Sequence, residues 1–238
     1  MENLIAQLCY AVGNRNRGQG RTGSECIMID GCYATSDGQG IQRSAVFKSG
    51  FTDRADTVAI LYILRTMDYE RLIIFGNRKD VNLRLQYDLA RYGYEIPVLS
   101  GDITQAKRIK ILERFRSGKE RVVIATDVAA RGIHVDDISL VINYDLPEQP
   151  EDYIHRIGRT GRAGHRGTAI SFLCEYGAYY LPAIEELLGT QFSSILPGEE
   201  MLLLPEAVKN PKLPEREESR KSHRPHRDGN RRSNRFRR

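Results

Sequence analysis

Hydrophobic residues in the middle of the chain follow two alternating patterns. Short, nearly continuous apolar runs are typical of strands covered on both sides, and they occupy Arg71 to Gly76, Glu95 to Ser100, Arg121 to Thr126, Ile138 to Tyr144 and Gly167 to Cys174. Between several of these runs, apolar residues recur at three- and four-residue intervals, as on one face of a helix. Strand and helix therefore alternate along this region.

The second pattern predicts three helices, which are expected to end at Gly93, Gly118 and Gly189, and a fourth is expected over Glu148 to Arg162. The apolar positions expected on the buried faces of the first three are Val81, Leu85, Leu89 and Tyr92; Ile109, Leu112 and Phe115; and Leu181, Ile184, Leu187 and Leu188. The alternation predicts an α/β fold with a mostly parallel, open sheet and helices on both faces. In such sheets, ligands bind at the carboxyl ends of the strands.

Three regions of the chain differ in composition. Residues 51–190 carry the alternating pattern and are expected to form one domain. Residues 1–50 contain eight glycines and no sustained period, so we expect little stable structure there, in a disordered leader or a misassembled reading frame. The alternative for this stretch is a small RNA-binding Arg/Gly segment. Residues 191–238 form an extension with an Arg-rich end.

Positive charge is concentrated in that last region. Lys209 to Arg238 contain 12 Lys and Arg against 4 Asp and Glu, which gives +8, and the whole chain is +5, so the remaining residues are net −3. The segment has no apolar period, so we expect it to be disordered and to attract polyanions. The alternative is a tail that only raises solubility.

Composition argues against two other classes of protein. No apolar run approaches the roughly 20 residues needed to cross a bilayer, and the N-terminus does not resemble a signal peptide. The four cysteines form no CxxC pair, and the histidines are not grouped with them at the spacing of zinc ligands, so no metal site is predicted. We expect a cytoplasmic protein without membrane contact.

Arginine and glycine recur at short intervals in His155 to Gly164 (HRIGRTGRAG). Arg156, Arg159 and Arg162 are three residues apart, which places them near one face if the segment is helical. A guanidinium group pairs with two phosphate oxygens at once, so this pattern favours a site that faces phosphate. The alternative is a solvated helix face with ordinary ion pairs.

This segment and Ala125 to Val135 (ATDVAARGIHV) resemble motifs VI and V of the DEAD-box RNA helicases. Ile73 to Lys79 (IIFGNRK) is similar to motif IV, and Leu99 to Arg108 (LSGDITQAKR) to the segment with the QxxR pair. Order and spacing match from about Asp53 to about Gly189, most closely to a bacterial subgroup. The resemblance implies the second RecA-like lobe of an enzyme that uses ATP with Mg²⁺ to unwind short RNA duplexes.

The resemblance implies a nucleotide-binding role for four residues. Arg159 and Arg162 are expected to be catalytic arginine fingers, which stabilise negative charge on the γ-phosphoryl group during transfer. Gly132 would let the chain approach the nucleotide closely. His134 stands where the commonest family pattern has an Asp that holds the ribose hydroxyls; the bacterial subgroup resembles this chain in having His, which can also form a hydrogen bond.

Four further residues are expected, by the same resemblance, to couple the two lobes. Asp127 and Arg131 would join the lobes in the closed state, and His155 and Arg156 would link the ATP site to the RNA site. Two alternatives follow from the residues alone: Asp127 could cap the N-terminus of a helix, and His155 could be a packed, hydrogen-bonded histidine.

RNA is expected to be held by its sugar-phosphate backbone, which carries no sequence information. The residues carried over for this surface are Gly101, Asp102, Gln105, Arg108 and Thr126, with Asn77 and Arg78 as weaker candidates. The alternative for Arg108 is a cation on the exposed face of an amphipathic helix.

Neither a GxxxxGK[ST] P-loop nor a DEAD tetrapeptide occurs in the 238 residues. We therefore expect this lobe to supply half of an ATP site, with Mg²⁺ held by a first RecA-like lobe in cis or in trans. The bacterial subgroup implies RNA degradation with an endoribonuclease as partner. The alternative function is an inactive fragment that serves as an RNA-binding or protein-binding module. A Rossmann domain is set aside, because no strand is followed by GxGxxG.

Overall fold

The apolar runs of the middle region form buried parallel strands. In the computed structural model these are β3 (Arg71–Phe75), β4 (Val98–Leu99), β5 (Val122–Ala125), β6 (Ile138–Asn143) and β7 (Gly167–Leu173). They lie in the spatial order β4-β5-β3-β6-β7, and each neighbouring pair is parallel. The structure describes residues 28–34, 41–48, 53–131, 133, 135, 138–161, 167–173, 177–195, 203 and 205–214.

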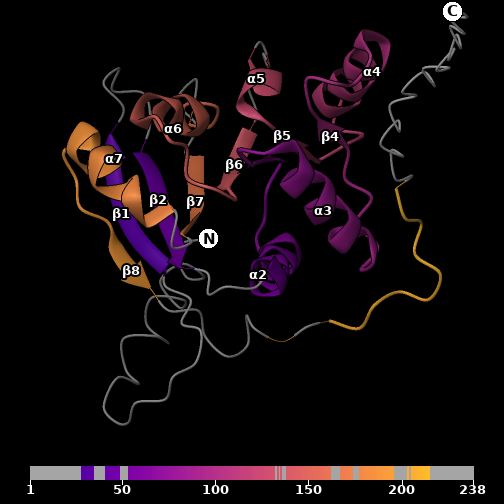
Figure 1. Ribbon diagram of the computed structural model, residues 1–238, viewed down its shortest axis with the longest axis horizontal. Helices are drawn as coiled ribbons and strands as arrows, with labels where there is room; N and C mark the ends of the chain where they lie inside the picture. The colour runs from indigo at the N-terminus through magenta and orange to yellow at the C-terminus, as the bar shows by residue number, and fades with distance from the viewer. Residues whose placement is uncertain are drawn as a thin grey trace, which may run out of the picture.

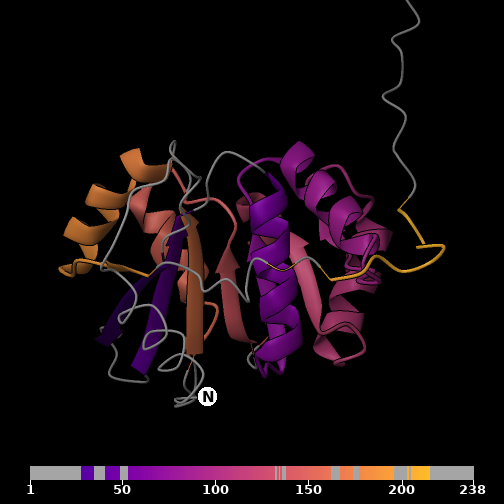
Figure 2. The same ribbon diagram turned by 90° about the horizontal axis from the view of Figure 1, so that it is seen from below.

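Helices cover both faces of this sheet (Figures 1 and 2). On one face, α2 (Asp53–Thr66) and α3 (Lys79–Ala90) share a buried apolar cluster with the strands. On the other face the helices are α4 (Gln105–Arg116), α5 (Asp127–Ala130), α6 (Pro150–Ile157) and α7 (Leu181–Leu188), with a 3-10 turn, η1 (Gly177–Tyr179), before the last. The predicted α/β class, a mostly parallel open sheet with helices on both faces, is confirmed.

Three further strands extend the sheet beyond β7. They are β2 (Ile41–Lys48), β1 (Met28–Ala34) and β8 (Ser193–Ile195), in that spatial order. β2 pairs in parallel with β7, whereas β1 is antiparallel to both β2 and β8. This differs from our expectation of little stable structure in residues 1–50. β1 and β2 are neighbours in the sequence, but β2 also pairs with β7 and β1 with β8, which are far away in the sequence, and no local pattern could reveal these two partners.

Two helices differ from their predicted limits or faces. The inner face of α4 carries Arg108, Ile111, Leu112 and Phe115. Ile109 is 47% exposed, so its predicted buried position is wrong. α6 ends at Ile157 and not at Arg162. The helix ends predicted at Gly93, Gly118 and Gly189 agree with the structure, since all three glycines have positive φ. Among the described residues, no helix is long and apolar enough to cross a lipid bilayer.

Candidate functional site

Polar side chains gather where β3, β5 and β6 end. Asn77 and Asp145 follow β3 and β6, Asp127 begins α5 after β5, and α6 brings Arg156 to the same place. Beside them lies a pocket of about 380 Å³, lined by Phe75, Asp127, Ala130, Arg131, Asp152, His155, Arg156 and Arg159. We call it the Arg156 pocket. It lies at the carboxyl edge of a parallel sheet, where ligands are expected.

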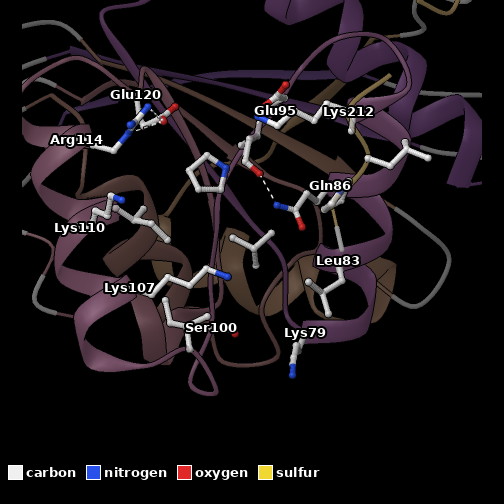
Figure 3. Close-up of a pocket in the computed structure, with 18 residues that line it drawn as sticks. Lys79, Leu83, Gln86, Glu95, Ser100, Lys107, Lys110, Arg114, Glu120 and Lys212 are labelled. Carbon is white, nitrogen blue, oxygen red and sulfur yellow. Dashed lines mark hydrogen bonds and ion pairs between the residues drawn. The ribbon is translucent and has the colours of Figure 1, made fainter. Parts of the chain in front are cut away.

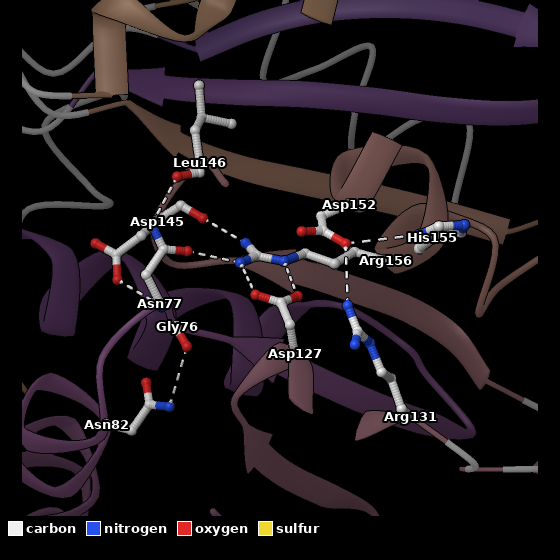
Figure 4. A network of polar contacts seen from close by, with 10 residues as sticks. All are labelled: Gly76, Asn77, Asn82, Asp127, Arg131, Asp145, Leu146, Asp152, His155 and Arg156. Atoms are coloured by element: carbon white, nitrogen blue, oxygen red, sulfur yellow. Dashed lines mark hydrogen bonds and ion pairs between the residues drawn. The ribbon is translucent and has the colours of Figure 1, made fainter. Parts of the chain in front are cut away.

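Arg156 is the centre of a hydrogen-bond network, and only 1% of its surface is exposed (Figure 4). Its Nε and Nη2 donate to the two carboxylate oxygens of Asp127, each at 2.6 Å. Nη1 donates to the backbone oxygen of Asp145 at 2.6 Å, and Nη2 also donates to Oδ1 of Asn77 at 2.6 Å. One guanidinium group therefore holds together the loops after three neighbouring strands.

Burial makes this network both costly and rigid. The guanidinium carbon of Arg156 lies 5.4 Å from the ring centre of Phe75, so one face of the cation is covered by an aromatic ring. A buried cation is tolerated when its hydrogen bonds are satisfied, and Arg156 has four. With its donors turned inward, Arg156 positions the pocket. Its expected part in linking two binding sites stays a prediction.

Asn77 has a closer role in this site than its sequence suggests. Besides accepting from Arg156, it donates from Nδ2 to the backbone oxygen of Leu146 at 2.8 Å, and its backbone N–H donates to Oδ2 of Asp145 at 3.1 Å. Our sequence reasoning named Asn77 only as a weak RNA candidate and did not single out Asp145. Both are polar residues shortly after buried strands, and this signal could have placed them at the site.

The open side of the pocket carries Arg131 and His155, whose side chains are 73% and 69% exposed. Both face Asp152: Nη2 of Arg131 lies 3.9 Å and Nδ1 of His155 3.6 Å from its Oδ1. These loose, exposed contacts leave both side chains accessible to a second body. The expected lobe-coupling roles of Asp127, Arg131, His155 and Arg156 stay predictions.

Two alternatives from the sequence are not what the structure has. Thr126, and not Asp127, occupies the N-cap position of α5, and the Asp127 carboxylate is bound to Arg156. His155 is exposed and not packed inside the fold.

Arg159 follows the end of α6 and lines the pocket, half-buried. Its Nε donates to the backbone oxygen of His155 at 3.2 Å. Both Arg156 and Arg159 line the pocket, but Arg156 is enclosed by the fold, whereas Arg159 is partly exposed. The other candidates for the nucleotide, Gly132, His134 and Arg162, lie outside the described residues.

The expected RNA contacts lie mostly around the first turn of α4. Gly101, Asp102 and Gln105 are exposed there, and Oδ2 of Asp102 accepts from Lys79 at 2.5 Å. Arg108 is on the inner side of α4, where its Nη2 donates to the backbone oxygens of Ala129 at 2.6 Å and Arg131 at 3.3 Å. It is therefore not a cation on an exposed face, because it closes the C-terminal end of α5.

Thr126 and Arg78, two further RNA candidates, lie outside α4. Thr126 is half-buried at the start of α5. Arg78 donates to both carboxylate oxygens of Asp80, at 3.1 and 2.7 Å, and this hydrogen bonding lowers the pKa of the Asp80 carboxyl. Among the described residues, no group of His, Cys, Asp or Glu side chains is arranged to hold a metal ion.

The parallel α/β sheet and the arginine network at its carboxyl edge agree with one class of protein, the C-terminal domain of helicases, and the comparisons show this class. The family model "Helicase conserved C-terminal domain" matches residues 55–164. The E. coli DEAD-box protein SrmB, solved in complex with the regulator of ribonuclease activity A, is 32% identical with a TM-score of 0.58, over 66% of this chain and 93% of that one. The chain belongs to the DEAD-box RNA helicase family, as a C-terminal RecA-like lobe.

Within the family, the chain is similar to proteins named ATP-dependent RNA helicase RhlB. It is 55% identical over 149 residues to the one from Pseudomonas syringae pv. tomato and 52% identical over 149 residues to the one from Pseudomonas putida. The alignments cover 62% of this chain and only 38% and 37% of the two relatives. S. cerevisiae Dbp5 bound to RNA and ADP BeF3 is 39% identical with a TM-score of 0.52, over 58% of this chain and 37% of that one.

Proposed function

We propose that the chain acts as the second lobe of an ATP-dependent DEAD-box RNA helicase that unwinds short RNA duplexes. The observation that carries this proposal is the Arg156 network, which joins the segments resembling motifs IV, V and VI through one buried guanidinium group and leaves Arg159 at the pocket. The two Pseudomonas relatives are named as ATP-dependent RNA helicases, and Dbp5 has been solved with RNA and ADP BeF3.

In this proposal the Arg156 pocket is the second lobe's half of the ATP site. The pocket fits an anion, because three arginines and a histidine line it against two aspartates, and one of those aspartates is bound to Arg156. ATP, with Mg²⁺ held by the first lobe, supplies the phosphoryl group whose transfer releases free energy. Arg159, together with Arg162, stabilises the negative charge that develops on the γ-phosphoryl oxygens.

The exposed rim has the second role. Arg131 and His155 contact the first lobe when the two lobes close. The Asp127–Arg156 pair holds the ends of the strands in place beside the nucleotide. Closure excludes water and brings the Arg159 guanidinium to the phosphate. Gly132 and His134 are assigned to the nucleotide by resemblance alone.

RNA is proposed to lie along the first turn of α4 and the start of α5. Gly101, Asp102 and Gln105 are exposed on that surface, and Thr126 lies at the N-terminus of α5. Contacts there are made to the sugar-phosphate backbone, so little sequence preference is expected. Arg108 acts on RNA through the position of α4, since its Nη2 is bound to the end of α5.

We further propose a place in RNA degradation, with an endoribonuclease as partner. Two things support this: the similarity to RhlB proteins, and the complex of the related SrmB with a regulator of ribonuclease activity. The cationic segment from Lys209 onward gives the chain a second way to attract RNA.

RNA-stimulated ATP hydrolysis tests the proposal. The purified chain is mixed with the first lobe of the Pseudomonas syringae relative, with and without single-stranded RNA. We expect turnover only in the mixture with RNA, and a loss of about 10³-fold in Arg159→Ala, the lower range for removing an arginine finger. Arg65→Ala, an exposed change on α2, should leave turnover unchanged. RNA binding without turnover in any mixture would support the binding-module alternative.

A further inference from the structure

A second hollow in the described part of the chain is a groove of about 910 Å³ between α3 and α4. It shares no lining residue with the Arg156 pocket. The two helices lie on opposite faces of the sheet, so the groove runs past the outer edge of β4 (Figure 3). The proposed function makes no use of it.

The floor of the groove is aliphatic. Its apolar lining includes Leu83, Ala90, Ile96, Val98, Ile103 and Ile111, and none of the lining residues is aromatic. Surfaces that hold single-stranded nucleic acid usually offer aromatic rings on which bases stack. An aliphatic floor favours the side chains of a peptide instead.

The rim of the groove carries positive charge that its own carboxylates do not neutralise. Glu95 is paired with Lys212 at 2.8 Å and Glu120 with Arg114 at 2.6 Å. Lys107 and Lys110, both exposed on α4, form no ion pair with any described residue. Figure 3 shows the Lys107 side chain extending from α4 over the groove. A ligand with carboxylates complements these two cations.

β4 is the last strand on one side of the sheet, and its Val98 lines the groove although it is only 7% exposed. Pro97 and Leu99 accept hydrogen bonds from the backbone N–H groups of Ile124 and Thr126, at 3.0 and 3.2 Å, so they face β5. Backbone groups alternate in direction along a strand, so the N–H and C=O of Val98 face the groove. An edge strand without a partner on one side is a template for an extended peptide.

The chain itself already lays an extended segment against this surface. The backbone N–H of Val208 donates to the oxygen of Arg91 at 3.1 Å, and Lys212 pairs with Glu95. Leu213 and Pro214 then line one end of the groove. An extended stretch with an aliphatic side chain therefore packs here in the folded protein.

We propose that this groove is a docking site for an extended, acidic peptide of a partner protein. Aliphatic side chains of the peptide enter between α3 and α4, its carboxylates pair with Lys107 and Lys110, and its main chain runs along Val98. The groove shares no lining residue with the Arg156 pocket, and its Lys107 lies on the first turn of α4, next to the proposed RNA surface.

Binding of a labelled peptide to the full chain tests this proposal. The probe is a fluorescein-labelled peptide of alternating Glu and Leu, about eight residues long, which spans about 26 Å when extended. Fluorescence anisotropy should show saturable binding. Lys107→Glu/Lys110→Glu should weaken it at least about tenfold, since two attractive contacts become repulsive. Ile103→Ala should also weaken peptide binding, because it removes apolar contacts from the floor of the groove.

The matched control is Arg65→Glu/Lys119→Glu, which changes the net charge equally at exposed positions outside the groove. It should change peptide affinity less than about twofold. Circular dichroism of each variant establishes that it is folded. Equal weakening by both double variants, or no saturable binding, would show that the groove does not recognise the peptide.

The same experiment distinguishes two other occupants of the groove, RNA and the chain's own C-terminal segment. If oligouridine binds and loses affinity in Lys107→Glu/Lys110→Glu while the peptide does not bind, the groove belongs to the RNA surface and the proposal is wrong. Peptide binding that occurs only after residues 215–238 are removed would assign the groove to the chain's own C-terminal segment.

Discussion

Arg156 brings a positive charge into the interior of the protein, beside an aromatic ring and away from water. Asp127 neutralises this charge with two hydrogen bonds, while Asn77 and the backbone of Asp145 accept from two more of its N–H groups. If one partner is removed, the other keeps its charge in a place where water cannot solvate it. The cost of losing one partner therefore exceeds the net value of the pair.

We expect Arg156→Met to lower the free energy of unfolding by about 3 kcal/mol, because it leaves the Asp127 carboxylate without its cation. Urea unfolding followed by circular dichroism measures this loss. Arg131→Met is the control: its side chain is 73% exposed, so a change of no more than about 0.5 kcal/mol is expected. Similar losses in both variants would contradict the central position of Arg156.

At the scale of elements, the connection between β3 and α3 fixes where Asn77 lies. Gly76 is buried there, and its backbone oxygen accepts from Nδ2 of Asn82 at 3.3 Å. A Cβ atom added at Gly76 would lie 1.9 Å from Oδ1 of Asn82, well inside contact distance. Both residues are enclosed by the fold, so neither can move away cheaply.

Gly76→Ala should therefore destabilise the protein by about 1–3 kcal/mol, the usual cost of overpacking. Thermal unfolding of the single variant, of Asn82→Ala and of the double variant measures the coupling. The double variant should be more stable than the sum of the two losses predicts, since Asn82→Ala removes the clash. Gly101→Ala is the matched control, because nothing lies within 4 Å of its added Cβ. If the losses of the two single variants simply add in the double variant, the clash is not the cause of the destabilisation.

The same scale shows what the sequence could and could not predict. Continuous apolar runs located the central strands because these strands are buried on both faces, and glycines marked three helix ends because they take positive φ. The buried face of α4 was misjudged because Arg108, a polar residue, occupies its first inner position and is satisfied by carbonyls of α5. No local pattern reveals such a partner.

Candidate site residues were partly predictable for the same reason. Arg156 and Arg159 look alike in the sequence, but of these two described arginines Arg156 is the one that meets Asp127 and Asn77 in the fold. That choice depends on the loops after two other strands, which tertiary packing brings together. Asn77 was therefore underrated, and Asp145 was not singled out.

On the scale of the whole molecule, β2 covers an edge that β7 would otherwise expose. The two strands pair in parallel over seven residues, from Gln42 with Gly167 to Lys48 with Leu173. β1 and β8 follow beyond β2 in the same sheet. Uncovered strand edges favour association with other chains.

Deletion of residues 1–50 should accordingly lower the melting temperature by several degrees, since a loss of 1 kcal/mol shifts it by about 2–4 °C in a chain of this size. It should also promote self-association, which light scattering detects. Deletion of residues 215–238, which removes none of the described strands, is the control. An unchanged melting temperature would instead support the expectation that residues 1–50 lie outside the folded body.

Arg108 also has a mechanical consequence. Its Nη2 fastens the first turns of α4 to the carbonyls of Ala129 and Arg131 at the end of α5. α5 has only four residues, about 6 Å of helix, and it begins at Asp127, whose carboxylate accepts hydrogen bonds from Arg156. A pulling force on RNA bound at the start of α4 would therefore pass from the Arg108 guanidinium group through the single turn of α5 to the Arg156 guanidinium group. It would end at the wall of the Arg156 pocket.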